Sequence, residues 1–264
     1  MLELNSKNFN ILRKRIINIS LEAAEVVMQN IGSKKTIKND GTPVTLADIK
    51  SDHIITKNLN LLSPKIPVFS EEGENFTAEE NLKPHWLIDP LDGTKSFVEG
   101  GDDFVVCIAF IKKQTPLLGC IAHPPSKKVW IGGKEFGSYL KFPGMKIKKI
   151  LCRNIPDEGP SIAISRHHIG PKLEAWLKKI KFQKTFKKGS ALKFALLAEG
   201  KVDLYPRTSA TYEWDSAAGQ AIVEGSGGKV HQLNGNKLIY GRPNRMNPNF
   251  IAYGNSNWVK FLVE

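Results

Sequence analysis

Apolar residues near the start of the chain recur at alternating spacings of three and four. They are Phe9, Leu12, Ile16, Ile19, Ala23 and Val26. This is the period of one helical face, and it predicts a helix over residues 6–31 that Gly32 stops. A second helix is predicted to follow Thr45. Its apolar positions are Leu46, Ile49, Ile55, Leu59 and Leu62.

Short apolar runs bounded by turn residues come next and predict β-strands. These strands cover residues 68–70, 86–89, 104–111, 117–123, 129–131 and 138–142. Connections such as Gln-Thr-Pro and Pro-Pro-Ser are typical of an antiparallel meander. After Ile150 strands and helices alternate. Strands are predicted over 161–165, 202–205, 229–232 and 250–253, and helices over 171–180, 190–199, around Asp215 and from Asn257 onwards.

The change of pattern near residue 150 predicts two closely packed lobes. Residues 1–150 would form an α+β lobe and residues 151–264 an α/β lobe, with the active site between them. The segment 234–249, rich in Gly, Pro and Asn, is predicted to be a surface loop. A chain of 264 residues can bury the large core that this arrangement needs.

The cysteines and the absence of long apolar segments indicate a cellular location. Cys107, Cys120 and Cys152 have no paired spacing, and two of them lie in apolar predicted strands. We expect all three to be reduced, buried and inert, as in a cytosol. Residues 1–15 contain no apolar leader region, and no stretch approaches the roughly 18 apolar residues of a membrane span. We expect a soluble cytoplasmic protein.

A net charge of +12 is the feature of the composition that most needs interpretation. Lysine-rich runs at 146–149 and 178–188 are compatible with a nucleic-acid or anionic-membrane surface. No aromatic-interleaved basic motif, zinc finger or helix-turn-helix pattern accompanies them. We therefore expect solvated lysines that steer an anionic small molecule, no specific nucleic acid, and at most weak peripheral membrane contact. The oligomeric state, monomer or dimer, stays open.

The segment 86–97 carries the main candidate chemistry. An apolar strand ends at Asp89, Pro90 fixes a turn, and Asp92 follows, so that both carboxylates can point into one small volume. Oxygen ligands without His or Cys favour Mg²⁺. Gly93 and Thr94 offer free backbone N–H groups to phosphate oxygens at the start of a predicted helix. Taken alone, the segment is equally compatible with a surface turn.

Three further acidic clusters stand at the edges of apolar segments. Thr45 and Asp48 open the second helix, where a capping box explains both residues. Glu71 and Glu72 end a short strand, and solvated loop acids are the alternative. Asp215 lies in the first turn of a helix of small residues, where the helix dipole favours an acid. Together the four clusters are what a multi-metal phosphate site requires.

The acidic motifs, in their order and spacing, resemble the signature set of the inositol monophosphatase superfamily of Mg²⁺-dependent, lithium-sensitive phosphatases. They are Thr45-Leu-Ala-Asp48, Ser70-Glu71-Glu72, Asp89-Pro-Leu-Asp92-Gly-Thr94 and Trp214-Asp215-Ser-Ala-Ala-Gly219. Four more resemble the bacterial 3'(2'),5'-bisphosphate nucleotidase branch, the CysQ type. They are Ile164-Ser165-Arg166-His167-His168, Gly189-Ser190-Ala-Leu-Lys193-Phe, Ala198-Glu-Gly200 and Leu204-Tyr-Pro-Arg207. The resemblance covers nearly the whole chain and implies the layered αβαβα sandwich of the inositol monophosphatase and fructose-1,6-bisphosphatase type.

The resemblance also implies the metal ligands. Glu71, Asp89 and the Leu91 carbonyl would hold one Mg²⁺, and Asp89, Asp92 and Asp215 a second, with Asp89 bridging them. A third, weaker ion is compatible with the pattern, so two or three ions are expected.

The catalytic roles follow from the same resemblance. Thr94 and Asp48 would form a hydrogen-bonded pair that activates a water on the metal, with Glu71 helping to place it. That water would attack phosphorus in line, while the amides of Gly93 and Thr94 hold the equatorial oxygens.

The substrate-selecting residues implied are His168, Ser190, Lys193 and Arg207, with Lys193 and Arg207 meeting a second phosphate. Each has a simpler alternative: Ser190 as an N-cap, Lys193 on a solvated helix face, Arg207 as a strand-end charge. The chain departs from the branch at two positions. His167 replaces a small polar residue, which leaves open which histidine reaches the ligand, and Ser96 replaces an acid, which leaves the metal ligands unchanged.

The expected function is that of a Mg²⁺-dependent phosphatase that removes the 3'-phosphate of adenosine 3',5'-bisphosphate to give AMP and phosphate, in sulfur metabolism. An inositol monophosphatase or another sugar-phosphate phosphatase is the alternative, because the metal motifs are shared. A catalytically inactive basic protein that binds RNA or membranes is a hypothesis from another class.

Overall fold

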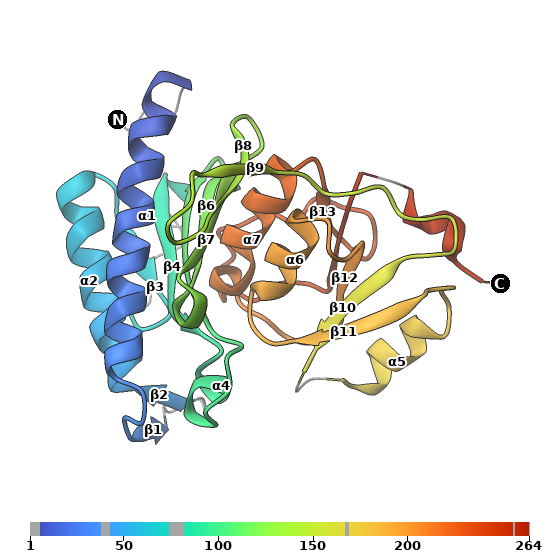
Figure 1. The fold of residues 1–264 in the computed structure, drawn as a ribbon, viewed down its shortest axis with the longest axis horizontal. Helices are drawn as coiled ribbons and strands as arrows, with labels where there is room; N and C mark the ends of the chain where they lie inside the picture. The colour runs from blue at the N-terminus through green and yellow to red at the C-terminus, as the bar shows by residue number, and fades with distance from the viewer. Residues whose placement is uncertain (1–5, 38–42, 74–81, 167–168, 256, 264) are drawn as a thin grey trace.

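The layers of the fold alternate between helices and sheets. A computed structural model describes residues 6–37, 43–73, 82–166, 169–255 and 257–263 (Figure 1). Helices α1 (Ser6–Gln29) and α2 (Leu46–Leu62) cover one face of a seven-stranded sheet. Helices α6 (Leu192–Ala198) and α7 (Glu213–Gly225) separate this sheet from a five-stranded sheet, whose far face carries α5 (Pro171–Leu177). The αβαβα sandwich expected from the sequence is confirmed.

The seven-stranded sheet is a meander with one parallel edge. Its strands, in spatial order, are β3 (Val68–Ser70), β4 (His85–Asp92), β5 (Val105–Lys112), β6 (Thr115–His123), β7 (Lys128–Gly133), β8 (Gly137–Lys141) and β9 (Lys148–Ile150). β3 and β4 are parallel, and the other pairs are antiparallel. The parallel edge places the ends of β3 and β4, which carry acids in the sequence, side by side.

The five-stranded sheet is mixed and is built from the second half of the chain. Its order is β11 (Lys184–Lys188), β10 (Ser161–Ser165), β12 (Leu204–Arg207), β14 (Phe250–Tyr253) and β13 (Lys229–Gln232). The short elements outside the two sheets are β1 (Lys35–Ile37), β2 (Pro43–Thr45), α4 (Thr94–Val98) and the 3₁₀ turns Pro124–Ser126 and Trp258–Phe261. The division into lobes at residue 150 stays a prediction, although each sheet draws its strands from one side of that position.

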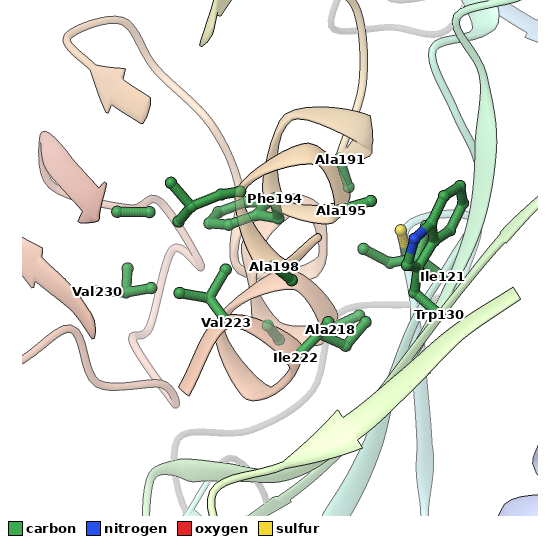
Figure 2. Close-up of a cluster of buried hydrophobic side chains, with 14 of the residues drawn as sticks. Ile121, Trp130, Ala191, Phe194, Ala195, Ala198, Ala218, Ile222, Val223 and Val230 are labelled. Atoms are coloured by element: carbon green, nitrogen blue, oxygen red, sulfur yellow. The ribbon is translucent and has the colours of Figure 1, made fainter. Parts of the chain in front are cut away.

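The middle helical layer depends on small residues. Alanines of α6 and α7 pack with Ile121 and Trp130 of the seven-stranded sheet (Figure 2). A Cβ added to Gly119 on β6 would overlap the backbone oxygen of Ala218 on α7, and one added to Gly219 would overlap the ring of Phe194. The Ser-Ala-Ala-Gly part of the α7 motif therefore serves close packing between helix, sheet and α6.

Several predicted elements differ from the structure. The lysine run 178–188 contains an edge strand, β11, and lysines at an exposed edge discourage pairing with other chains. The closing helix from Asn257 is only a 3₁₀ turn, in which the Asn257 side chain accepts from the Val259 amide at 3.1 Å. The segment 234–249 is irregular, but it is wrong to describe it as a surface loop, because Leu238 and Tyr240 are buried.

Helix α1 is amphipathic, with Ile16, Ala23 and Val27 buried and charged residues on the other side. Within the described ranges, the helices all lack the length or the apolar character that crossing a bilayer demands. The three cysteines are free, and Cys107 and Cys120 are buried as predicted, while Cys152 is half-buried.

His85, the first residue of β4, is fully buried and gives the fold a pH dependence. Its ring stacks on Phe69 at 4.6 Å, and Nδ1 lies 2.8 Å from the Lys83 carbonyl, to which it donates. The Nε2 atom has no hydrogen-bond partner in the described part of the chain. Burial lowers the pKa of His85 from 6.5 to about 4.

Stability should therefore fall as the pH decreases from 6.5 towards 4, since the unfolded chain binds a proton there that folded His85 refuses. The gap between the two values corresponds to at most roughly 3 kcal/mol. In His85→Phe this part of the pH slope should disappear, as measured by urea unfolding across that range. His53→Gln, at an exposed histidine of α2, is the control. An unchanged slope in His85→Phe would assign the dependence to other groups.

Candidate active site

A bulge in β4 brings two acids to the same place. Residues three apart in a regular strand point to opposite faces. The register between β4 and β5 shifts between Asp89 and Asp92, so the second carboxylate returns to the side of the first. The Ser51 hydroxyl of α2 donates to the Pro90 carbonyl at 2.8 Å and anchors the bulge from the helical layer. The segment that the sequence left open as a surface turn is thus the buried end of strand β4.

Glu71 reaches the same place through the parallel pairing of β3 with β4. The Glu71 amide donates to the Ile88 carbonyl at 3.2 Å, which places Glu71 beside Asp89. Asp215 arrives from the first turn of α7, where its Oδ2 accepts from the Tyr212 amide at 2.8 Å. Carboxylate oxygens of Glu71, Asp89 and Asp215 all lie within 4.8 Å of one another. The structure therefore brings together acids from three distant segments.

The charges of this cluster oppose one another. Burial, followed by the charges of Glu71, Asp92 and Asp215, raises the pKa of Asp89 well above its usual range. Burial and the nearby charge of Asp92 raise the pKa of Asp215 to about 7. The pKa of Asp92 is also raised, mainly by burial. Without a cation, Asp215 would be partly protonated near neutral pH.

The donor set fits a hard divalent cation. The Oδ2 atom of Asp89 is buried and accepts no hydrogen bond from the residues that the structure describes. Carboxylate oxygens, with no His or Cys ligand in the cluster, suit Mg²⁺. A cation would satisfy the orphaned oxygen and favour the charged forms of all these acids.

Asp48 serves both the helix start and the site. Its Oδ2 accepts from the amide and hydroxyl of Thr45 at 2.7 and 2.6 Å, which completes the capping box of α2. Its Oδ1 lies 3.0 Å from the Thr94 hydroxyl, which is also 3.0 Å from the Leu91 carbonyl. The capping interpretation and the catalytic interpretation are thus compatible, because each uses a different oxygen.

A cavity of about 250 Å³ adjoins the acids. Its other lining residues include Gly93, Ser190, Lys193, Tyr205 and Arg207. Five of the six residues predicted to bind substrate, Gly93, Thr94, Ser190, Lys193 and Arg207, therefore line one space. The sixth, His168, lies outside the described residues, as does His167.

Lys193 is not on a solvated helix face. Only 2% of it is exposed, its Nζ donates to the Ser190 carbonyl at 2.6 Å, and it lies 5.1 Å from the centre of the Tyr205 ring. Burial and the charge of Arg207 lower the pKa of Lys193 to about 7. Ser190 has φ +49° and directly precedes Ala191, the N-cap of α6, and its hydroxyl accepts from the Leu192 amide at 3.4 Å. An anion bound in this cavity would favour the protonated form of Lys193.

Sequence reasoning missed Asp103, and it noted Glu213 beside Asp215 without giving it a role. Asp103 lines the cavity and is buried, and Glu213 is buried beside Arg245, whose guanidinium lies over the Phe69 ring. The sequence provided only a weak indication of their burial. Asp103 directly precedes the predicted strand 104–111, and Glu213 lies at the start of the predicted helix around Asp215. Their basic partners come from distant parts of the chain, which a single sequence does not pair.

The inositol monophosphatase family profile matches residues 12–259. The chain belongs to the inositol monophosphatase family. Among the relatives, the 3'(2'),5'-bisphosphate nucleotidase CysQ of Buchnera aphidicola is 40% identical over 253 residues, covering 93% of this chain and 94% of the relative. The protein of that name from Escherichia coli K12 is 35% identical over 242 residues, covering 89% and 97%. The resemblance inferred from the motifs is confirmed.

Solved structures agree with this family assignment. CysQ from Bacteroides thetaiotaomicron, described as a bacterial member of the inositol monophosphatase family, matches with a TM-score of 0.80 and 29% identity. The match covers 92% of this chain and 97% of that one. The inositol monophosphatase fold therefore extends over almost the whole molecule.

Proposed function

We propose that the protein is a Mg²⁺-dependent phosphatase that hydrolyses the 3'-phosphate of adenosine 3',5'-bisphosphate to AMP and phosphate. The observation that carries the proposal is the convergence of Glu71, Asp89 and Asp215 beside a cavity that contains Lys193 and Arg207. Acids and cations around one cavity suit a ligand with two phosphates, of which the cations would hold one and metal ions on the acids the other. The names of the relatives favour this substrate over an inositol phosphate.

Two or three Mg²⁺ ions, held by Glu71, Asp89, Asp92, Asp215 and the Leu91 carbonyl, would lower the pKa of a water and neutralise phosphate charge. The protein's own contribution begins at Thr94. Its hydroxyl, hydrogen-bonded to Asp48, would orient that water. The Asp48 carboxylate would accept the proton that the water loses, through the Thr94 hydroxyl.

Phosphate binding at the reacting end uses the turn between β4 and α4. Gly93 has φ +101°, and a Cβ there would lie 2.5 Å from the Asp103 carbonyl, so only glycine permits this backbone. Gly93 and Thr94 line the cavity, and we expect their amides to hold the phosphoryl oxygens. Lys193 and Arg207 would hold the 5'-phosphate, and such an enzyme would serve sulfur metabolism and respond to lithium.

The test compares phosphate release from adenosine 3',5'-bisphosphate and from inositol 1-phosphate, with Mg²⁺ and with EDTA. We expect Mg²⁺-dependent release and a higher kcat/KM for the nucleotide. A preference for inositol 1-phosphate would favour the sister activity. No release at all, with salt-sensitive RNA binding that Asp92→Asn leaves intact, would contradict the phosphatase proposal.

Lys193→Met should raise KM for adenosine 3',5'-bisphosphate about tenfold, since a charged hydrogen bond contributes roughly 1.5–3 kcal/mol. KM for adenosine 3'-monophosphate, which has no second phosphate, should change much less. Methionine keeps most of the buried volume. Lys201→Met, just beyond α6 and paired with Glu199, is the matched control. Equal effects on both substrates would remove Lys193 from the second-phosphate site.

A further inference from the structure

Asp103, between α4 and β5, is a buried acid that the proposed mechanism does not use. Only 1% of it is exposed. Its carboxylate accepts from Arg166 Nε at 2.6 Å, from Lys188 Nζ at 2.8 Å and from the Gly189 amide at 2.8 Å. Its own amide donates to the Ser96 hydroxyl at 3.1 Å, which ties it to α4. Burial opposes the charged form, but these donors together lower the pKa of Asp103.

The partners of Asp103 stand at one edge of the other sheet. β10 and β11 are parallel, and Ser165 pairs with Lys188 in their register. Arg166 and Lys188 thus mark the carboxyl ends of neighbouring strands, where ligands commonly bind. Asp103 itself comes from the half of the chain that supplies Asp89 and Asp92. It therefore connects the metal-binding half to the strand ends beside the cavity.

The segment 189–191 is fixed at both of its ends by acids from that half. The Gly189 amide donates to Asp103, and the Ala191 amide donates to Asp92 Oδ2 at 2.6 Å. Ser190 lies between them, and its carbonyl accepts from Lys193. A Cβ at Gly189 would lie 2.8 Å from the Cβ of Asp103, so the approach leaves no spare room. A shift of Gly189 would move Ser190 and Lys193 relative to the metal-binding acids.

We propose that Asp103 is a positioning residue that fixes the segment 189–191, and with it Lys193, at the distance from Asp92 that a nucleoside bisphosphate requires. The inference rests on the proposed function and adds a residue that acts through the backbone of its neighbours. Arg166 and Lys188, with 47% and 33% of their side chains exposed, bind the buried Asp103 carboxylate from the solvent side. A purely structural ion pair between the two halves is the competing explanation.

The chain provides a matched control for that explanation. Asp203 is also buried and also accepts three charged or backbone hydrogen bonds, two from Arg153 and one from the Ser161 amide, each at 2.8 Å. It does not line the cavity. Asp203→Asn therefore weakens a network of the same kind and size at a place remote from the acids.

The experiment compares Asp103→Asn and Asp203→Asn by kinetics and by calorimetry with Mg²⁺ present. Asp103→Asn should raise KM for adenosine 3',5'-bisphosphate and weaken binding of AMP about tenfold, as expected for one lost charged contact. Binding of inorganic phosphate, turnover of adenosine 3'-monophosphate and the Tm increase on adding Mg²⁺ should stay near wild-type values. Asp203→Asn should lower Tm while leaving the ratio of the two KM values unchanged.

Three outcomes would overturn the inference. The first is an equal change of KM for the bisphosphate and the monophosphate in Asp103→Asn. The second is a larger change of KM for the bisphosphate in Asp203→Asn as well, and the third is undiminished AMP binding in Asp103→Asn. If Asp103→Asn does not fold, Lys188→Met tests the same contact from its partly exposed side and should give the same split. Wild-type protein that does not hydrolyse the bisphosphate would instead contradict the proposed function, on which the inference rests.

Discussion

Asp89→Asn should lower kcat by at least about 10³-fold, because roughly 4 kcal/mol of transition-state stabilisation depends on the charges this carboxylate would hold in place. Asp89 lies within the cluster formed with Glu71 and Asp215, and its buried Oδ2 accepts no hydrogen bond from the residues that the structure describes. Asparagine preserves the acceptor for the Leu91 amide, which lies 3.1 Å from Oδ1. Phosphate release measures the loss.

The metal-free variant should nevertheless be more stable than the wild type. The pKa of Asp215 is raised to about 7 and that of Asp89 is raised well above its usual range, so the folded state binds more protons than the unfolded chain above pH 4. Stability of the metal-free wild type must then fall as the pH rises from about 4 to 7 and beyond. Removing one acid relieves this repulsion and should raise Tm in EDTA by at least about 2 °C at pH 8.

Adding Mg²⁺ should reverse the order, with a large Tm increase for the wild type and little for Asp89→Asn. Asp157→Asn, which removes one exposed charge, is the control. Unfolding of Asp89→Asn, or retention of its turnover, would recast Asp89 as a structural residue.

Gly119→Ala should lower the free energy of unfolding by at least about 3 kcal/mol, or abolish folding, since the added methyl cannot be accommodated by a rotamer change. Its Cβ would overlap the Ala218 oxygen and lie 2.8 Å from the Ala218 Cα, so helix α7 as a whole would have to move. Because α7 carries Asp215, the surviving fraction should also bind Mg²⁺ more weakly. Chemical denaturation and calorimetry measure the two effects.

The control is Gly170→Ala at the N-cap of α5, where a Cβ would meet nothing within 4 Å. It should cost less than about 1 kcal/mol. Comparable losses in the two variants would show that the Gly119 contact with α7 is not what limits the substitution.

The sequence revealed those parts of the site that follow local rules. Glu71, Asp89 and Asp215 stand at strand ends or a helix start, and the structure brings these acids together. The helix α1, with its regular apolar period, and the strand β5, with its continuous apolar run, were also predictable. Each of these features depends on neighbours within a few positions along the chain.

The missed features depend on distant partners. Asp103 can be buried because Arg166 and Lys188, at the ends of two other strands, donate hydrogen bonds to it. No spacing along the chain predicts these contacts. Strand β11 was missed because its lysines are largely exposed, as an edge strand allows on its open side. Tyr240 is buried in an otherwise polar segment because its hydroxyl binds Gln220 of α7 at 2.8 Å.

The double use of Asp48 has an evolutionary consequence. One oxygen completes the cap of α2 through Thr45, and the other binds the Thr94 hydroxyl. A glutamate would displace both contacts, and an asparagine would turn one acceptor into a donor. A substitution of Asp48 would therefore have to be compensated at both contacts at once. We expect Thr45, Asp48 and Thr94 to be retained together in descendants of this chain.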